Sequence, residues 1–262
     1  VPAMYERMYP LLKGHDLSFI QHIVCGGDMV SSDLIDRYNV ILGRKNGGAS
    51  FLPGYGLTEC GGACILVDED RDDIPEGCVG KPVNGLEMCL VEPGTTKVIA
   101  DNEEGELCLL GGSIMTGYYK NEKATADVMR KHKDGRIWLH TGDIVTFDEG
   151  RNIIFRSRCK RMVKINGYNV YPTIIENTME KSPVVSEVCA VSVPWKTDKK
   201  MKLYVTLADS AADRKKAEEE IMAFAKANLN HWECPLAVSV IDEMPRTKMN
   251  KKDYKVFAET EE

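Results

Sequence analysis

The hydrophobic pattern of the chain changes near Cys159 and Lys160, and this change constrains the fold more than any other feature. From about residue 65 to 156, short apolar runs such as CILV, LEMCLVE and GELCLLGG alternate with Gly, Pro, Asn and Asp. That punctuation is typical of antiparallel strands joined by tight turns. Beyond Lys160 the pattern resets to helices and strands of a compact domain of about 100 residues. The sequence therefore predicts two domains, 1–158 and 159–262.

The first domain opens with a different pattern from its β-rich remainder. Over residues 1–64, MYERMYPLLKG and SSDLIDRYNVIL have helical spacing, the second with Ser or Asp as its cap. FIQHIVCGG reads as a strand, and ASFLPGYGLTECGG as a strand that enters a Gly-rich loop. Over 65–158 we expect a barrel or distorted sheet interrupted by one helix near 124–132. The predicted fold class is α/β plus a β-rich part of a large domain, followed by a small α+β domain.

Composition narrows the function classes. The net charge of −6 argues against nucleic-acid binding, which normally requires a basic surface. No apolar stretch approaches the roughly 18–20 residues of a transmembrane helix, and the N-terminus lacks the pattern of a secretory signal. Among nine cysteines the only close pair is Cys60 and Cys64, which lacks zinc-knuckle spacing and any second pair to complete it. Free thiols in a reducing compartment fit this pattern better.

Three stretches carry candidate chemistry: GYGLTE at 54–59, WLHTGD at 138–143, and PRTKMNKK at 245–252. Each has a simple structural reading, because Gly-containing segments often form turns and basic runs are commonly solvated. The chemical reading is that GYGLTE offers close backbone approach, an aromatic face at Tyr55, a hydroxyl at Thr58 and a carboxylate at Glu59. Such a set suits a nucleotide with Mg²⁺, which prefers oxygen ligands. Asp143, after a Gly turn, suits a ribose diol.

In this order, the motifs resemble the adenylate-forming (AMP-binding) superfamily of acyl-CoA synthetases, luciferases and peptide-synthetase adenylation domains. GGDMVSSDL from Gly26, GELCLLGGSIMTGYYKNEKAT from Gly105 and SRCKRMVKINGYNVYPTIIE from Ser157 match further family segments, so the resemblance spans nearly the whole chain. NGYNVYP and PRTKMNKK are closer to acyl-CoA and aryl-CoA synthetases than to peptide-synthetase domains. The resemblance implies an acid–CoA ligase that uses ATP, Mg²⁺ and coenzyme A. It also implies a cytoplasmic location, since ATP and CoA are needed.

The resemblance also implies roles for individual residues. Nucleotide-binding positions are Gly26, Gly27, Asp28, Tyr55, Gly56, Thr58, Asp143 and Arg158. Of these, Tyr55 would stack on adenine, Thr58 would meet the α-phosphate, and Asp143 would hold the ribose hydroxyls. Glu59 would help bind Mg²⁺, and Lys251 would act with Thr58 and Glu59 in catalysis by reaching the carboxylate and the α-phosphate. Lys160 would be the hinge of the small domain, and Gly167 and Tyr168 would face CoA.

The sequence departs from the family pattern in one large way. The family's Ser/Thr/Gly-rich, lysine-bearing phosphate loop should precede GGDMVSSDL, and nothing like it occurs in these 262 residues. Smaller departures are Ser157 where Gly is usual, Asn169 where Arg is common, and Asn250 where Gly precedes the catalytic lysine. With Val1 instead of Met at the start, we expect the C-terminal part of a longer ligase, which would need its missing N-terminal half.

Two alternatives remain open. In one, the chain is a catalytically silent fragment or subunit. In the other, its parent uses another acceptor, as acyl-carrier-protein ligases and luciferase-like enzymes do. The identity of the carboxylic acid cannot be deduced from the residues.

Overall fold

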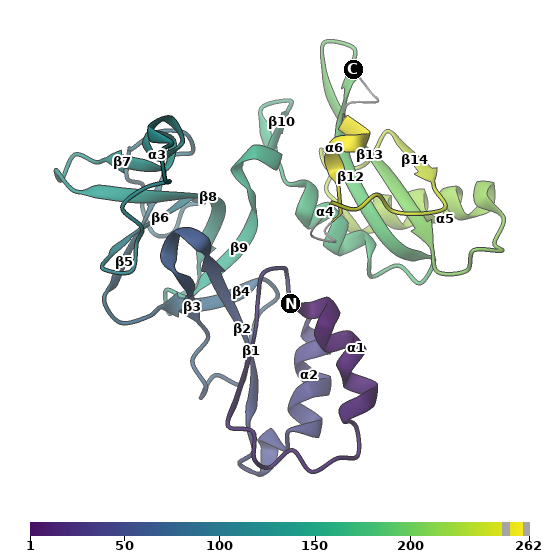
Figure 1. The fold of residues 1–262 in the computed structure, drawn as a ribbon. Coiled ribbons are helices and arrows are strands. Elements are labelled where there is room, and N and C mark those ends of the chain that lie inside the picture. Colours follow the sequence, from purple (N-terminus) through teal and green to yellow (C-terminus); the bar gives the residue numbers. More distant parts are fainter. Residues whose placement is uncertain (248–251, 259–262) are drawn as a thin grey trace. The chain divides into compact units, whose positions relative to one another are not determined.

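The chain folds into two compact units, Val1–Cys159 and Lys160–Glu262, in a computed structural model that describes residues 1–247 and 252–258. Each unit has its own hydrophobic core. Figure 1 shows the helices and strands of each unit. Lys251 lies outside the described residues.

Unit 1 begins with an α/β segment: α1 (Pro2–Leu12), β1 (His22–Cys25), α2 (Ser32–Ile41) and β2 (Ser50–Leu57). The hydroxyl of Ser31 accepts a hydrogen bond from the amide of Leu34 and so caps α2 as predicted. The two strands pair in parallel, with His22 opposite Ser50. Tyr38 of α2 is fully buried and stacks on Phe51 of β2 at 4.5 Å, which fixes the helix against the sheet.

The rest of unit 1 extends this sheet into a nine-stranded one in the order β1-β2-β3-β4-β9-β8-β6-β5, with β7 paired to β8. Apart from the β1–β2 pair, the pairings are antiparallel, as the punctuation of the sequence predicts. The strands are β3 (Gly62–Leu66), β4 (Cys78–Pro82), β5 (Leu86–Val91), β6 (Gly105–Gly111), β7 (Met129–Lys131), β8 (Ile137–Phe147) and β9 (Ile153–Arg158). Short 3-10 turns cover Arg44–Asn46 (η1) and Thr58–Cys60 (η2).

The predicted helix near 124–132 is displaced. Helix α3 runs from Glu122 to Val128, with Asn121 as its cap. Met129 then turns into an extended conformation and begins β7, which pairs with β8 through Arg130 and Trp138. Strand pairing overrides the local helical pattern here.

The WLHTGD segment is not a turn between strands, as the sequence suggested, but part of the 11-residue strand β8. The register between β6 and β8 slips within it: Glu106 faces Ile144, whereas Cys108 faces His140. Between these two pairs, β8 contains more residues than β6, and the additional residues of β8 form a bulge. Gly142 lies in this bulge with φ +71°, and the chain does not reverse direction there. Likewise, GYGL belongs to β2 and not to a loop.

Unit 2 is a small α+β domain built around a three-stranded sheet in the order β12-β13-β14. Its elements are β10 (Val163–Ile165), β11 (Tyr168–Val170), α4 (Pro172–Met179), β12 (Val185–Trp195), β13 (Asp198–Leu207), α5 (Arg214–Asn228), β14 (Ala237–Val240) and α6 (Tyr254–Ala258), after η3 (Cys159–Arg161). Buried residues of α4 and α5, Ile175 and Ile221 among them, pack into one core with Leu203 of β13. The fold class predicted from the sequence is thus confirmed.

Candidate functional site

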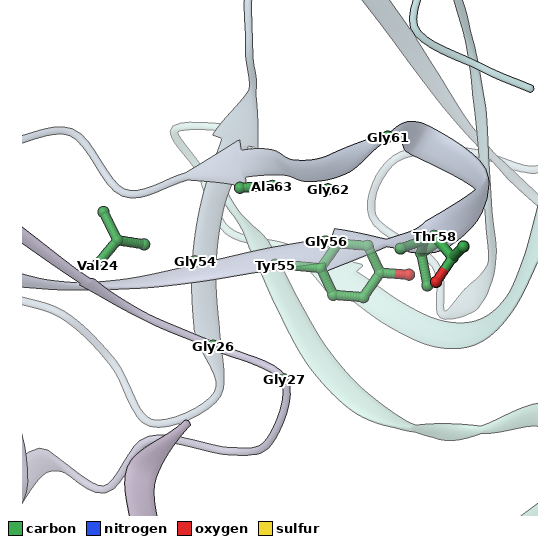
Figure 2. Close-up of a pocket in the computed structure, with 11 residues that line it drawn as sticks. Val24, Gly26, Gly27, Gly54, Tyr55, Gly56, Thr58, Gly61, Gly62 and Ala63 are labelled. Atoms are coloured by element: carbon green, nitrogen blue, oxygen red, sulfur yellow. The ribbon is translucent and has the colours of Figure 1, made fainter. Parts of the chain in front are cut away.

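A hollow of about 670 Å³ lies at the ends of β1, β2 and β3 in unit 1 (Figure 2). Gly54 to Leu57 run along β2 and Thr58 begins η2, Gly61 to Ala63 lie on the neighbouring segment, and Gly26 and Gly27 come from the loop after β1. The predicted nucleotide-binding residues Gly26, Gly27, Tyr55, Gly56 and Thr58 are therefore brought together in one concave surface.

The glycines are required by the close approach of backbones around this hollow. A Cβ on Gly26 would lie 2.3 Å from the carbonyl oxygen of Gly54, and one on Gly56 would lie 2.4 Å from that of Gly62. Real side chains do not come so close, so any other residue would push β1, β2 and β3 apart. The surface that remains is mainly backbone, which lets a flat or anionic ligand approach the main chain.

Tyr55 connects the hollow to a buried charged pair. Its Oη donates a hydrogen bond to Oδ2 of Asp143 at 2.5 Å. Asp143 is fully buried, and Nε of Arg158 lies 2.9 Å from its other oxygen, Oδ1. The Arg158 side chain is 53% exposed. This ion pair is not aligned as a hydrogen bond, so Oδ1 has no hydrogen-bond partner among the described residues.

Burial controls the ionisation of both partners. Loss of solvent raises the pKa of Asp143 from 3.8 to about 6, although the Arg158 charge and the Tyr55 hydrogen bond act in the opposite direction. The pKa of Tyr55 lies well above 10, because the phenol is buried and faces the Asp143 carboxylate. At neutral pH the pair is therefore a phenol donating to a carboxylate.

The bulge of β8 places Asp143 in this position. The Asp143 amide donates to Oγ1 of Thr141 at 3.2 Å, and that hydroxyl donates to the carbonyl of Leu107 at 2.8 Å. The Gly142 amide donates to Oε1 of the buried Glu106 at 3.2 Å. Glu106 was not among the predicted residues, and only the pairing of β6 with β8 reveals its role.

Glu59, predicted as a Mg²⁺ ligand, lies on η2 and is held by the segment after β6. Tyr118 donates a hydrogen bond to its Oε1, and the Met115 amide donates to its carbonyl at 2.8 Å. The hydrogen bond from Tyr118 to the Glu59 carboxylate is the main cause that raises the pKa of Tyr118 to about 12. Glu59 is half-buried and follows the exposed Thr58 on η2, and carboxylate and hydroxyl oxygens are ligand types that fit Mg²⁺. Tyr118 lies within the segment that begins at Gly105, and no role was predicted for it from the sequence.

The remaining predicted residues are not part of this group. Asp28 is exposed, and its carboxylate accepts from the amide of Met29. Lys160, Gly167 and Tyr168 belong to unit 2: Lys160 lies on η3, and Gly167 (φ +83°) follows Asn166 (φ +48°) in the two-residue turn between β10 and β11. Lys251 is outside the described residues.

Known proteins match this chain along most of its length. Residues 1–119 match the family model described as AMP-binding enzyme, and residues 174–251 match that of the AMP-binding enzyme C-terminal domain. A long-chain-fatty-acid–CoA ligase of Salmonella typhimurium is 34% identical over 232 residues, 88% of this chain and 38% of that protein. A feruloyl-CoA synthase of an Amycolatopsis species is 30% identical over 256 residues, 96% of this chain and 49% of that protein.

Solved structures agree with the sequence relatives. An ATP-bound chimera of RpMatB and BxBclM superposes with a TM-score of 0.79 at 25% identity, covering 99% of this chain and 49% of that one. The chain therefore belongs to the adenylate-forming superfamily, acyl-CoA synthetase type. It spans half or less of the length of these relatives. Within the described residues, no helix is long and apolar enough to cross a membrane.

Proposed function

We propose that this chain supplies part of the nucleotide site of an acid–CoA ligase. Such an enzyme joins a carboxylic acid to ATP, giving acyl-AMP and pyrophosphate, and then transfers the acyl group to the thiol of CoA with release of AMP. The observation that carries the proposal is Asp143, a buried carboxylate. One of its oxygens pairs with Arg158 but accepts no hydrogen bond from the described residues, and the other is held by Tyr55, a residue of the glycine-walled hollow. A ribose hydroxyl is the kind of donor that this oxygen lacks.

The positions of the site residues in unit 1 support the following proposed roles. Tyr55 presents its ring to the hollow, where an adenine can stack, while its hydroxyl keeps Asp143 in place. Gly26, Gly27 and Gly56 leave the main chain accessible to the base and its phosphates. The exposed Thr58 hydroxyl can donate to the α-phosphate, and Arg158 adds a positive charge beside the ribose. Asp28, exposed and bonded to Met29, is the weakest member of the predicted set.

Glu59 is the residue proposed to hold Mg²⁺. The bound ion would neutralise phosphate charge during displacement of pyrophosphate. Tyr118 orients the carboxylate by its hydrogen bond to Oε1, and the Met115 amide fixes the backbone beneath it.

Unit 2 is proposed to supply the residues that distinguish the two half-reactions. Lys251 would stabilise the charge that develops when carboxylate and α-phosphate meet, and loss of one such donor typically costs about 3 kcal/mol in the transition state. Gly167 and Tyr168 would face the pantetheine arm of CoA, and Lys160 would be the hinge. We expect Lys251→Ala to abolish acyl-adenylate formation in the intact enzyme while sparing thioester formation from supplied acyl-adenylate. Equal loss of both half-reactions would contradict this assignment.

A second candidate is that the chain by itself is catalytically silent. It is favoured by the length comparison, since the chain covers 38% and 49% of two relatives. In that case catalysis would require residues outside the matched region, and the family resemblance predicts a lysine-bearing phosphate loop among them. The nine free cysteines support a reducing, cytoplasmic location for either candidate.

The two candidates are separated by measuring nucleotide binding and catalysis on the same preparation. ATP and AMP binding is followed by calorimetry, and pyrophosphate release is followed with a panel of long-chain fatty acids and hydroxycinnamic acids, with and without CoA. Release that depends on an acid supports the ligase, and CoA consumption identifies the acceptor. Binding without release supports the silent candidate.

The matched variants are Asp143→Ala and Asp101→Ala. Both aspartates pair with Nε of an arginine at about 3 Å, but the Asp101 side chain is 52% exposed. We expect Asp143→Ala to weaken AMP binding at least ~10-fold, because a charged hydrogen bond is worth roughly 1.5–3 kcal/mol, and Asp101→Ala to bind normally. Unchanged binding by a folded Asp143→Ala protein would overturn the proposed site.

A further inference from the structure

A second cluster of reactive side chains lies on the β5–β6–β8 part of the sheet, apart from the nucleotide hollow. Cys89 faces Cys108 directly across β5 and β6, and Cys108 faces His140 directly across β6 and β8. Residues opposite one another in antiparallel strands point to the same face, with Cβ atoms about 5 Å apart. Sheet register therefore aligns two thiols and an imidazole in one row.

The hairpin between β7 and β8 adds a second imidazole. His132 and His140 approach with their Nε2 atoms 2.9 Å apart, and the Trp138 ring stacks on His132 at 5.5 Å. Possible ligand atoms of Cys108, His132 and His140 all lie within 4.8 Å of one another. These three residues are buried, at 0%, 5% and 3% exposure, so the cluster is shielded from water.

The hydrogen bonding of the cluster is incomplete. Nδ1 of His140 lies 3.2 Å from Oε2 of Glu106, close but poorly aligned, and Nδ1 of His132 has no partner among the described residues. Because the two Nε2 atoms face each other, only one can carry a proton between them. Buried polar atoms are rarely left unpaired, and a missing ion is one ordinary explanation.

We propose that Cys108, His132 and His140, with Cys89 as fourth ligand, bind one divalent cation of the zinc type. Two thiolates and two imidazoles form the common tetrahedral set for Zn²⁺, and their charges cancel that of the ion, which permits burial. Zinc–ligand bonds of about 2.0–2.3 Å place neighbouring ligand atoms about 3.3–3.8 Å apart, so the imidazoles need separate by only a few tenths of an ångström. The Cys89 thiol lies outside the group of atoms within 4.8 Å of one another and would have to move toward the ion.

Glu106 fits this proposal as the residue that orients a ligand. A metal-bound histidine commonly presents its other ring nitrogen to a carboxylate, as His140 does to Glu106. Glu106 also accepts the Gly142 amide beside Asp143. Metal binding would thus fasten β5, β6, β8 and the β7–β8 hairpin and stabilise the bulge that positions Asp143.

Binding also has a defined proton balance. Each thiol loses its proton to solvent as its sulfur bonds to the ion, and both imidazoles bind neutral, so two protons leave per ion. In the metal-free protein the two thiols instead share a hydrogen bond, which raises the pKa of Cys108 and lowers that of Cys89.

The test is a Co²⁺ titration of the whole chain after it has been reduced and stripped of metal by a chelator. The zinc content of the untreated protein is measured separately by mass spectrometry. We expect one equivalent of Co²⁺ to give tetrahedral visible bands and a thiolate-to-cobalt charge-transfer band in the near ultraviolet. Cys108→Ser and His132→Gln, with folding checked by circular dichroism, should each weaken binding more than ~10-fold. Glu106→Gln should keep the bands with affinity reduced about 10–100-fold.

The control is Cys60→Ser, because Cys60 and Cys64 form another hydrogen-bonded thiol pair in the same unit. This variant should titrate as the original protein does. Absence of a thiolate charge-transfer band in the unmodified reduced protein would overturn the proposal, whatever the variants do. Equal loss in Cys60→Ser and Cys108→Ser would also overturn it.

Discussion

Tyr55 and Asp143 are 88 residues apart in the sequence, yet the phenol of one donates a hydrogen bond to the buried carboxylate of the other. One residue lies on β2 and the other on the bulge of β8, and each belongs to a separate motif. The hydrogen bond joins the glycine-walled hollow to the charged pair formed with Arg158.

Tyr55→Phe tests this link directly. The substitution leaves Oδ2 of a buried carboxylate without its donor, so we expect unit 1 to lose about 1–3 kcal/mol of unfolding free energy at pH 7.5. The loss should be smaller at pH 4.5, where Asp143 is protonated. Denaturant unfolding at the two pH values measures the difference. Tyr119→Phe is the control, since Tyr119 is 88% exposed and should change nothing.

Asp143→Asn tests the ionisation of the same residue. The folded-state pKa of about 6 exceeds the ordinary 3.8, so the folded protein binds this proton more tightly. The resulting stabilisation is fully present below about pH 4 and is lost as the pH rises through about 6. Above pH 7 the ionised carboxylate costs roughly 3 kcal/mol. The asparagine variant should therefore be more stable at pH 7.5, with a flatter stability profile between pH 4 and 6.

Thermal unfolding across that pH range measures both effects. A variant that keeps the original slope would assign the pH dependence to other groups. A variant less stable than the original protein at pH 7.5 would show that the Arg158 ion pair outweighs the cost of burial.

Periodicity and motif order were sufficient to predict the fold class, because most elements of both units carry their own hydrophobic pattern. Helix α2 with its Ser31 cap and the amphipathic α5 are examples. The predicted elements were wrong where pairing with another strand decides the local conformation. Met129–Lys131 is a strand because β8 lies beside it, and Gly142 makes a bulge because β6 continues past it.

The candidate site was predictable only in part, for the same reason. Tyr55, Thr58, Glu59 and Asp143 stand in recognisable motifs, and the structure gathers them. Glu106 and the cluster of Cys108, His132 and His140 have no local signal, since sheet register and the β7–β8 hairpin bring them together. Spacing rules for metal ligands detect neighbours in sequence, and this cluster spans two strands and a hairpin, or three strands and a hairpin with Cys89.

Gly117→Ala tests how the segment that holds Glu59 is shaped. Gly117 has φ +154°, and a Cβ there would lie 2.8 Å from Cγ2 of Thr125. Thr125 cannot easily yield, because its hydroxyl accepts from the Tyr118 amide at 2.9 Å. We expect a loss of about 1–3 kcal/mol of stability from strain and weaker Mg²⁺·ATP binding, as Tyr118 shifts away from Glu59.

Gly112→Ala is the matched control in the same segment. Among the described residues nothing lies within 4 Å of a Cβ at Gly112, and its φ is not positive. Stability should be unchanged or slightly higher, as for other tolerated Gly→Ala changes. If both alanine variants behave alike in thermal unfolding and calorimetry, the conformation at Gly117 does not position Tyr118.

Glu176→Ala tests the stability of unit 2 through its buried ion pair. Both terminal guanidinium nitrogens of Arg161 donate hydrogen bonds to the Glu176 carboxylate, at 2.9 and 2.7 Å. Oε1 of Glu176 also accepts a hydrogen bond from the Ala190 amide at 2.8 Å. Removing the carboxylate leaves the buried guanidinium without its counter-ion, although it still donates to the Ala190 carbonyl at 3.2 Å, and leaves the buried Ala190 amide without its acceptor. We therefore expect unit 2 to lose about 3–5 kcal/mol. Asp242→Ala breaks the exposed pair with Arg214 and should cost less than about 1 kcal/mol.

Hydrogen exchange measures the two units separately. Glu176→Ala should increase exchange in β12, β13 and α4, while β5, β6 and β8 stay protected. Uniform loss of protection would mean that the units unfold together.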